Sequence, residues 1–488
     1  MAATDQTHEQ AVVDRVPKGL YIGGEWRDTS ETLGVEDPST GEVIAEVADA
    51  QVDDALAALA AADEAQADWA QTPSRERGEI LRRAYDLIME RVDDLALVMT
   101  LEMGKPIAES KAEVTYAADF LHWFAGEATR ISGEYKPAEK GGFRVLTMKQ
   151  PVGPCLFITP WNFPLAMGTR KIGPQIAAGC TAVIKPAKQT PLSMLALAQI
   201  LEEAGLPGGV LNVVTAKSSG SIMEPLIKDP RTRKLSFTGS TEVGKKLIEQ
   251  SADQVLRVSM ELGGNAPFLV FDDADLDDAV EGAMIAKMRN IGEACTSANR
   301  FHVAEAVADE FAEKLAERMG ALKIGRGVEE DVKVGPLIDD DQRGKVAELV
   351  EDARDKGAKV LVGGEKVEGA GYYYKPTVLS DVSDDARVLG EEIFGPVAPV
   401  RGFQSEDEAI AAANDTEYGL VAYVYTSNLK RAFRVVEGLK TGMVGLNQGL
   451  VSNAGAPFGG VKQSGFGREG GKEGIEEYLE TKYVAMKL

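Results

Sequence analysis

Two hydrophobic patterns alternate along the chain, and each predicts a different kind of element. Apolar residues recur every three or four positions over 53–70 and 74–103, which predicts two amphipathic helices. We expect Ser74 to cap the second of these helices and Gly104, followed by Lys-Pro, to end it. The first twenty residues are polar, and we expect them to be frayed.

Short apolar runs separated by glycine and proline take over after residue 144. They predict buried strands, with helices between them, over 152–159, 182–185, 210–214 and 234–238. One such helix is expected to begin after Thr190-Pro191 and to end at Gly205. Strands that alternate with helices predict βαβ units and a mostly parallel sheet.

The alternation returns after residue 261, which predicts a second α/β unit. Strands are expected over 266–271 and 359–362, and helices over 275–289 and from 303 to about 322. Two further segments, 143–149 and 481–488, alternate like edge strands. Because an unpaired edge is a template for pairing, they could pair with each other or with another subunit.

The composition is typical of a soluble globular protein. Of the 488 residues (52.2 kDa), 44% are hydrophobic and 27% are charged, and the length suggests about three domains. The chain has 53 Lys and Arg against 77 Asp and Glu, a formal net charge of −24. This excess would repel phosphate backbones and anionic lipids, so no nucleic-acid or membrane partner is expected.

Cysteine usage and the N-terminus indicate the compartment. The three cysteines, Cys155, Cys180 and Cys295, form no CxxC pair, and their odd number argues against a disulfide framework. The N-terminus has no apolar signal core, and no run of about 18 apolar residues is present. We therefore expect a cytoplasmic protein.

Five segments carry candidate chemistry, and two of them are a turn and a cysteine loop. In FTGSTEVG a strand ends, turns at Gly239-Ser240 and starts a helix, whose N–H groups could face a phosphate. An ordinary strand-to-helix turn would look the same, because Thr241 replaces the middle glycine of the dinucleotide fingerprint. Cys295, in the small-residue loop RNIGEACTSANR, is either a nucleophile or a buried small hydrophobe.

The other three segments offer a base, an amide and a cation. Glu261, in MELGGNAP, is either a turn acceptor or a partly buried base. Asn162, in TPWNFP, follows a strand and could donate to a developing oxyanion. Lys185, in AVIKPA, is either a buried cation at a strand end or a lysine at the rim.

Together, and in this order, these segments resemble the NAD(P)-dependent aldehyde dehydrogenase superfamily. EEIFGPV at 391–397 and APFGGVKQSGFG at 456–467 extend the resemblance over nearly the whole chain. AMGTRKIG, MELGGNAPFLVFDDADLDDAVEGA and VSN are most similar to succinate-semialdehyde dehydrogenases. The resemblance implies an α/β fold with a Rossmann-like cofactor domain (1–128 and 152–261), a catalytic domain (262–471) and a small β oligomerisation arm (129–151 and 472–488). Relatives assemble through that arm, which implies a homodimer or homotetramer.

The resemblance also implies the reaction. Cys295 would attack the aldehyde, and the oxyanion of the thiohemiacetal would lie between the Asn162 amide and the Cys295 N–H. Hydride transfer to the nicotinamide would leave a thioester, and Glu261 would activate the water that releases the acid.

Cofactor and substrate residues follow from the same resemblance. NAD or NADP would be bound by Thr159, Pro160, Trp161, Lys185, Lys188, Gly239, Ser240, Glu392 and Phe394. Lys188 stands where NAD-preferring relatives often carry a glutamate, which favours NADP or dual use. Arg170, Arg289 and Ser452 would hold the distal carboxylate of a small aldehyde, succinate semialdehyde first. Each arginine could instead form a salt bridge in this acidic protein, and no metal ligand is implied.

The cysteine loop departs from the close relatives at two positions. Glu293 stands where they usually have glutamine, and if it faced the pocket its carboxylate would oppose a thiolate and an anionic substrate. Ser297 stands where some relatives have a second cysteine, so no local disulfide switch is expected.

Other functions stay open from the sequence. Glutarate semialdehyde and 2,5-dioxopentanoate are rival substrates, and the enzyme could have broad specificity. A cysteine hydrolase would need a histidine base, and none of His8, His122 and His302 lies in a motif-like setting. A non-catalytic protein that kept the fold is disfavoured, because Cys295 and Glu261 are both intact.

Overall fold

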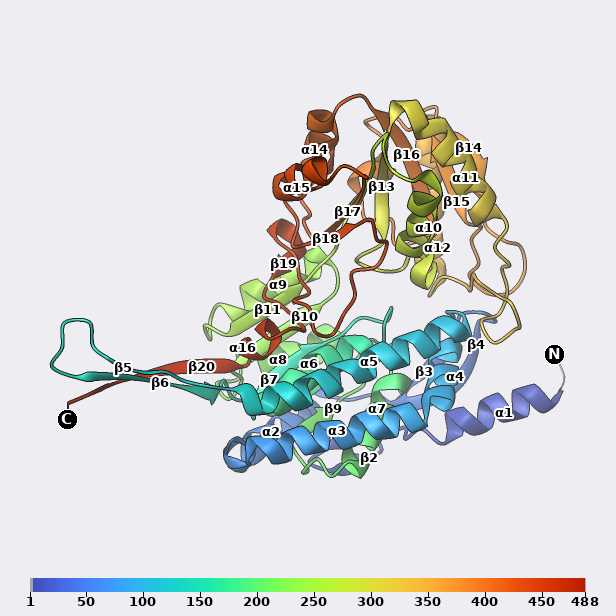
Figure 1. The fold of residues 1–488 in the computed structure, drawn as a ribbon. Helices are drawn as coiled ribbons and strands as arrows, with labels where there is room; N and C mark the ends of the chain where they lie inside the picture. Colours follow the sequence, from blue (N-terminus) through green and yellow to red (C-terminus); the bar gives the residue numbers. More distant parts are fainter. Residues whose placement is uncertain (1–2, 488) are drawn as a thin grey trace.

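The computed structural model describes residues 3–487, which form two lobes and a narrow arm (Figure 1). The first lobe is built on an eight-stranded sheet in the order β19-β11-β10-β7-β8-β9-β1-β2, parallel from β11 to β9. Its strands are β1 (Leu20–Ile22), β2 (Glu25–Arg27), β7 (Cys155–Ile158), β8 (Ala182–Lys185), β9 (Leu211–Val213), β10 (Lys234–Thr238), β11 (Arg257–Glu261) and β19 (Gly465–Phe466). The four strands expected between 152 and 238 are therefore all present.

Helices cover both faces of this sheet. They are α1 (Ala3–Asp14), α2 (Val52–Gln71), α3 (Ser74–Glu90), α4 (Val92–Met103), α5 (Ile107–Glu127), α6 (Ala166–Ala178), α7 (Leu192–Glu203), α8 (Ser219–Lys228) and α9 (Thr241–Ser251), with the hairpin β3 (Thr32–Asp37) and β4 (Glu42–Ala48) beside them. Side chains alternate between the faces along β7: Cys155 and Phe157 pack with α3 to α7, whereas Leu156 packs with α2 and α8. The period of two along each strand thus separates the two cores.

Three N-terminal predictions are wrong. Residues 3–14 form helix α1 and are therefore not frayed, while residues 1–2 lie outside the described residues. The helix expected over 74–103 breaks at Arg91 (φ −115°, ψ 20°), where α3 ends and the acidic first turn of α4 begins. Ser74 is the first helical residue of α3 and forms no capping bond, because Pro73 occupies the cap position. The end at Gly104 is confirmed, with a left-handed φ of 90°.

The second lobe contains a seven-stranded sheet in the order β14-β15-β16-β13-β12-β17-β18, in which only the β14–β15 pair is antiparallel. Its strands are β12 (Ala266–Val270), β13 (Ala298–Ala304), β14 (Lys359–Val362), β15 (Thr377–Ser380), β16 (Val397–Phe403), β17 (Val421–Tyr425) and β18 (Met443–Leu446). Its α-helices are α10 (Leu276–Met288), α11 (Ala308–Gly320), α12 (Asp340–Asp355), α13 (Arg387–Gly390), α14 (Glu406–Asn414) and α15 (Leu429–Gly438).

One prediction for the second lobe needs correction. The segment expected to start a helix at residue 303 belongs to β13, and α11 begins only at Ala308. All seven residues of β13 are buried, and Phe301 and Val303 pack in the core of this lobe. Burial on both faces favours a central strand of a parallel sheet over an amphipathic helix.

The arm is a three-stranded antiparallel sheet made of β5 (Tyr135–Pro137), β6 (Arg144–Pro151) and β20 (Leu479–Met486). The two predicted edge segments pair with each other, with Val484 opposite Leu146. Figure 1 shows the arm projecting from the first lobe, with the C-terminus near its tip. Tyr135 and Tyr483 are 60% and 56% exposed on it, so the arm presents aromatic surface to solvent.

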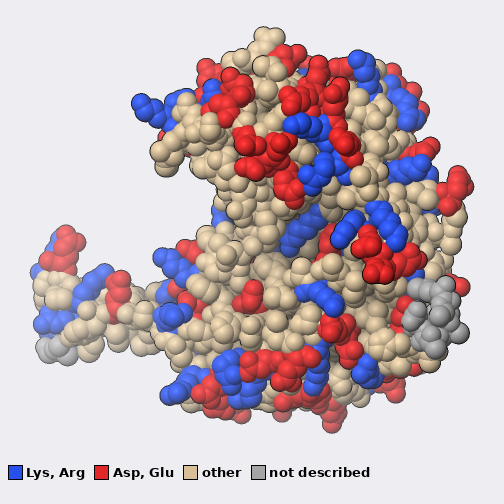
Figure 2. Space-filling view, turned by 45° about the vertical axis from the view of Figure 1, so that its right-hand side comes forward, with Lys and Arg blue, Asp and Glu red and all other residues tan. Residues whose placement is uncertain are grey.

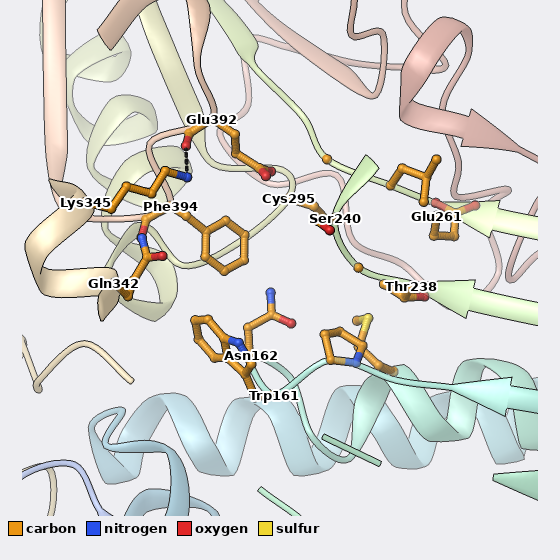
Figure 3. A pocket seen from close by; sticks show the side chains of 15 residues that line it. Trp161, Asn162, Thr238, Ser240, Glu261, Cys295, Gln342, Lys345, Glu392 and Phe394 are labelled. Atoms are coloured by element: carbon orange, nitrogen blue, oxygen red, sulfur yellow. Dashed lines mark hydrogen bonds between the residues drawn. The ribbon is translucent and has the colours of Figure 1, made fainter. Parts of the chain in front are cut away.

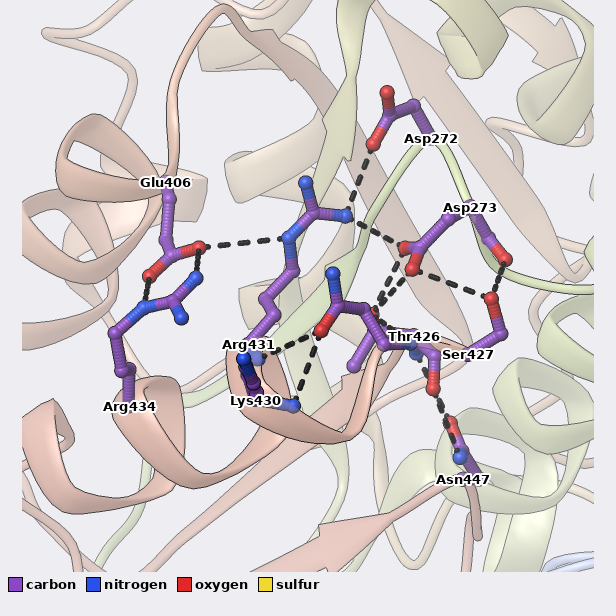
Figure 4. A network of polar contacts seen from close by, with 10 residues as sticks. Asp272, Asp273, Glu406, Thr426, Ser427, Lys430, Arg431, Arg434 and Asn447 are labelled. Atoms are coloured by element: carbon purple, nitrogen blue, oxygen red, sulfur yellow. Dashed lines mark hydrogen bonds and ion pairs between the residues drawn. The ribbon is translucent and has the colours of Figure 1, made fainter.

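A polar network fastens α14 and α15 to the edge of the second sheet (Figure 4). Arg431 of α15 pairs with Asp272 at 3.0 Å and Asp273 at 2.6 Å, just beyond β12, and with Glu406 of α14 at 3.4 Å. Thr426, which follows β17, donates its hydroxyl to the Asp273 carboxylate at 2.8 Å.

Acidic and basic side chains are interspersed on the face shown in Figure 2, where red residues lie over both lobes. Among residues 3–487, no helix is long and apolar enough to cross a membrane.

Candidate active site

A cavity of about 220 Å³ lies between the two lobes, at the carboxyl ends of β7, β10 and β11 (Figure 3). Such strand ends are the usual ligand-binding edge of an open parallel sheet. The first lobe contributes Pro160, Trp161, Asn162, Met167, Thr238, Gly239, Ser240, Glu261, Leu262 and Gly263, and the second contributes Cys295, Gln342, Lys345, Glu392 and Phe394. The cavity therefore collects three predicted catalytic side chains and most of the predicted cofactor residues.

The nucleophile loop is strained directly before Cys295. Asn290, Ile291 and Gly292, in the short helix η2 (Arg289–Gly292), have left-handed φ values of 52°, 61° and 79°. Such backbone persists only when its surroundings hold it in place. The Asn290 N–H donates to the Glu109 carboxylate at 2.5 Å, and its side-chain amide donates to the Asn162 carbonyl at 3.0 Å. The loop that carries Cys295 is thus anchored to the first lobe.

The Asn162 side chain is oriented on both sides. Its carbonyl oxygen Oδ1 accepts a hydrogen bond from the Phe163 N–H at 3.1 Å, and its Nδ2 donates to the Glu293 carbonyl at 3.0 Å. Its backbone carbonyl accepts from Lys105 Nζ at 2.7 Å. An amide nitrogen has two protons, and because one is used in this contact, one remains for an oxygen in the cavity.

The thiol and the carboxyl group that line the cavity both have a raised pKa. Burial raises the pKa of Cys295 to about 12, while the nearby guanidinium of Arg170 lowers it in part. Burial, with the charge of Glu469 added to it, raises the pKa of Glu261 well above its usual range. Glu261 Oε2 has no hydrogen-bond partner among the described residues. Glu261 is thus free to bond with a group inside the cavity.

None of the three predicted substrate residues is part of this cavity wall, and they are engaged differently. Arg289 Nη1 donates to Ser452 Oγ at 2.8 Å, and its guanidinium lies 4.9 Å from the Phe163 ring centre. Arg170 forms a buried ion pair with Glu469 at 2.7 Å and stacks at 3.8 Å on Phe458. The salt bridge considered as an alternative from the sequence is therefore present for Arg170, whereas Arg289 has a neutral partner.

The cofactor side of the cavity combines a helix N-terminus, an aromatic pair and a carboxylate. Ser240 caps α9 by accepting from the Val243 N–H at 3.4 Å. The rings of Trp161 and Phe394 meet edge to face at 5.4 Å. Glu392 accepts from the Gly264 N–H at 2.9 Å, and burial raises its pKa to about 6. A helix N-terminus can bind a phosphate, and a carboxylate can bind ribose hydroxyls. These residues therefore fit a nicotinamide dinucleotide.

The remaining predicted cofactor residues do not line this cavity. The Thr159 hydroxyl, at the end of β7, is buried and has no partner among the described residues, which leaves it available to a ligand. Lys185 Nζ donates to Ser219 Oγ, and burial lowers its pKa to about 8. Lys188 is exposed and lines a separate cavity of about 350 Å³ together with Glu102 and Lys217.

Four polar side chains around the site were not predicted. Gln342 and Lys345, on α12, donate to the carbonyls of Phe394 and Glu392, each at 2.7 Å. Lys171 pairs with Glu469 at 2.5 Å. No local pattern marks these residues, because their role depends on segments more than 45 positions away in the chain.

Comparison with known proteins agrees with this architecture. The aldehyde dehydrogenase family matches residues 26–484. A succinate-semialdehyde dehydrogenase of Paenarthrobacter nicotinovorans is 58% identical over 444 residues (91% of this chain, 99% of that protein). A glutarate-semialdehyde dehydrogenase of Pseudomonas putida is 53% identical over 470 residues (96% and 97%). The crystal structure of an NADP-dependent enzyme from E. coli superposes with a TM-score of 0.95 at 51% identity, covering 97% of this chain and 98% of that one.

The chain belongs to the aldehyde dehydrogenase family and has its fold. It is an oxidoreductase that uses a nicotinamide cofactor. The hydrolase and non-catalytic alternatives are accordingly set aside. No histidine lines the cavity, and burial lowers the pKa of His302, on β13, to about 3.

Proposed function

We propose that this enzyme oxidises a short aldehyde that carries a carboxylate at its far end, with succinate semialdehyde as the first candidate. The observation that carries the proposal is the Arg289–Ser452 pair, which lies close enough to Cys295 for its guanidinium to affect that thiol. A guanidinium whose hydrogen-bond partner is neutral keeps its full charge for an anionic ligand. Relatives named for succinate and glutarate semialdehyde support the same class.

Arg170 contributes differently to substrate binding in this proposal. Because Glu469 already neutralises Arg170, we assign the main share of carboxylate binding to Arg289 and Ser452. Arg170 then adds directional N–H donors and a positive field beside Glu261 and Cys295. Glutarate semialdehyde and 2,5-dioxopentanoate remain second candidates, since both carry the same terminal carboxylate.

In the proposed mechanism, Cys295 Sγ forms a bond to the aldehyde carbon. The ionised form of Glu261 takes the thiol proton directly or through one water molecule, since Glu261 shares the cavity and has an unpartnered oxygen. The carbonyl oxygen becomes negative and accepts the free N–H of Asn162, and a single such donor is worth about 3 kcal/mol. The hydride that leaves the former aldehyde carbon would be accepted by a nicotinamide bound beside Phe394.

The second half of the reaction is hydrolysis. Glu261 first releases the thiol proton to solvent, and it then takes a proton from a water molecule as the water oxygen attacks the acyl carbon of the thioester on Cys295. The C–S bond breaks, the thiolate takes this proton back from Glu261 and the carboxylic acid leaves. The raised pKa of Glu261 suits this role, because a carboxylate with a higher pKa is a stronger base.

The finer cofactor preference is also part of the proposal. We assign Ser240 and the first turn of α9 to the pyrophosphate, Glu392 and Lys185 to ribose hydroxyls, and Phe394 to the nicotinamide. Lys188, exposed three residues after Lys185, would attract a 2′-phosphate, which favours NADP or dual use. The NADP-dependent E. coli relative is in line with this preference.

We further infer that two or more copies associate through the arm and that the protein works in a reducing cytoplasm. The arm extends away from its own lobes, and its exposed Tyr135 and Tyr483 need a partner surface. The free cysteines Cys155, Cys180 and Cys295 suit a reducing compartment.

The test is a matrix of initial rates followed at 340 nm. Succinate semialdehyde, glutarate semialdehyde, 2,5-dioxopentanoate and butanal are each combined with NAD and with NADP. We expect carboxylated aldehydes to exceed butanal by about a hundredfold in kcat/KM, or about 2.7 kcal/mol of transition-state binding. Equal rates for butanal would contradict the carboxylate proposal and leave only the general aldehyde dehydrogenase activity.

A further inference from the structure

Glu293 lies two residues before the nucleophile, yet its side chain is not part of the cavity wall. It is fully buried (0% exposed), and its Oε1 accepts a hydrogen bond from the Ile338 N–H at 3.2 Å. Its Oε2 has no partner among the described residues. The charge repulsion in the pocket considered from the sequence therefore does not apply, because the carboxyl group contacts the segment that leads into α12.

The charged groups around Glu293 offer it no free counter-ion. Lys105 is the nearby cation, but its ammonium is held by Glu113 at 2.5 Å and by the Asn162 carbonyl. Asp339, the N-cap of α12, adds negative charge beside Glu293, and α5 adds Glu109 on the other side of the loop. Burial, with the charge of Asp339, raises the pKa of Glu293 well above its usual range. An unpaired buried carboxyl is most stable with its proton on.

The position of Glu293 connects both halves of the active site. Its backbone carbonyl accepts from the side-chain amides of Asn162 at 3.0 Å and Asn290 at 2.9 Å. Its side chain reaches Ile338, directly before the start of α12. Helix α12 carries Gln342 and Lys345, which hold the loop of Glu392 and Phe394 by its carbonyls.

We propose that Glu293 is a positioning residue that, as a neutral carboxylic acid, joins the nucleophile loop to the start of α12. It thereby fixes Cys295 and the oxyanion amide of Asn162 relative to the loop that faces the cofactor. This role belongs to the aldehyde dehydrogenase reaction as such and does not depend on which aldehyde is the substrate.

The first test compares two variants of Glu293 with a matched control. Glu293→Gln preserves shape and neutrality, so its kcat at pH 7 is expected to stay within about twofold of the wild type. Glu293→Ala removes the link to Ile338, and we expect kcat to fall about tenfold. Asp341→Asn removes an exposed carboxylate from the same end of α12 and serves as the control. A Glu293→Gln variant as impaired as Glu293→Ala, or an unimpaired Glu293→Ala, would overturn the proposal.

The second test needs no substrate and follows apparent melting temperature from about pH 5 to about pH 8. A carboxyl whose pKa is raised by folding stabilises the protein fully below its unfolded value and loses that contribution as pH rises through the folded value. Glutamine does not titrate. The melting temperature of Glu293→Gln should therefore rise relative to that of the wild type as pH increases, whereas that of Asp341→Asn should not. The proposal would be overturned if the difference in melting temperature between the wild type and Glu293→Gln stayed constant, or if the wild type became the more stable of the two as pH increased. Either result would show that Glu293 is charged.

Discussion

At the scale of single residues, burial away from water sets the pKa values of the ionisable groups in the cavity. Cys295 and Glu261 line the same cavity, and burial raises the pKa of each. A raised pKa disfavours the ionised form of each group, so each proton transfer depends on partners inside the cavity. Both groups must lose a proton to act, and turnover should therefore rise with pH.

We predict that kcat/KM for succinate semialdehyde increases from about pH 6 to about pH 9. The cause is the raised pKa of Cys295 and Glu261, which leaves a larger reactive fraction at each higher pH. Initial rates in buffers of constant ionic strength measure the profile. A profile that is flat or falls over this range would contradict the assigned proton transfers.

Replacing Glu261 by glutamine should separate the two halves of the reaction. We expect kcat to fall by about a hundredfold or more, because no base activates water for hydrolysis of the thioester. The acyl group should then accumulate on Cys295 and be visible as a mass increase of the rapidly quenched protein. The exposed Glu249, on the outside of α9, gives a matched control as Glu249→Gln. A Glu261→Gln variant that turns over normally would refute the role of Glu261.

At the scale of elements, ion pairs fix the positions of helices that the hydrophobic pattern alone does not determine. Arg431 has 21% of its side chain exposed and joins α15 to three carboxylates and to the Phe271 ring, 4.7 Å away. Burial raises the pKa of Asp273, but its bonds to Thr426, Arg431 and Ser427 outweigh this effect, and the pKa is lowered overall. The network therefore stabilises the second lobe when Asp273 is ionised.

We predict that Arg431→Met lowers the free energy of unfolding by about 1–2 kcal/mol at pH 7. A group with a lowered folded pKa stabilises the protein above its unfolded value, about 3.9 for Asp, and loses this contribution as pH falls through the folded value. The difference from the wild type should therefore shrink below about pH 4. Denaturant titration measures the free energy of unfolding of each variant. Arg434→Met removes only the exposed contact with Glu406, so it should lower this free energy by less. Equal losses for both variants would contradict this account.

Short apolar strands could be predicted from the sequence, whereas a helix that distant residues hold in place could not. Strands β8 and β10 match their predicted ranges because they are short, apolar and bounded by turn residues. Helix α1 was missed because its sequence is polar and it is held from outside, as when Glu9 pairs with Arg326 at 2.8 Å. The predicted residues Cys295, Glu261 and Asn162 share one cavity, whereas Gln342 and Lys345 became visible only once distant segments were folded together.

At the scale of the whole molecule, the site depends on how two lobes meet. Arg326 of the second lobe pairs with Asp37 of the first at 2.8 Å, and the Tyr372 hydroxyl donates to Glu36 at 2.5 Å. These contacts lie far along the chain from Cys295. They nevertheless hold together the two lobes, of which the first contributes Asn162 to the cavity and the second contributes Cys295. The arm adds a third level of organisation, because it offers unpaired aromatic surface outside both lobes.

We predict that ending the chain after Tyr478, which removes β20, abolishes the proposed association of copies and leaves monomers. The loss of β20 leaves β6 paired only with β5 and removes the exposed Tyr483. Light scattering after size exclusion measures the mass. The milder Tyr483→Asp should weaken assembly, whereas Tyr483→Phe should preserve it. An unchanged mass for the shortened chain would show that the arm does not mediate assembly.

The central claim is that Arg289, with Ser452, selects aldehydes that carry a carboxylate. The most direct test measures kcat/KM for succinate semialdehyde and for butanal in the wild type and in Arg289→Met. We predict that the variant loses about a hundredfold with succinate semialdehyde and changes little with butanal, because only the first aldehyde has a charge to be paired. If both aldehydes lose equally, or if the preference for succinate semialdehyde survives, Arg289 does not read the carboxylate and the account is wrong.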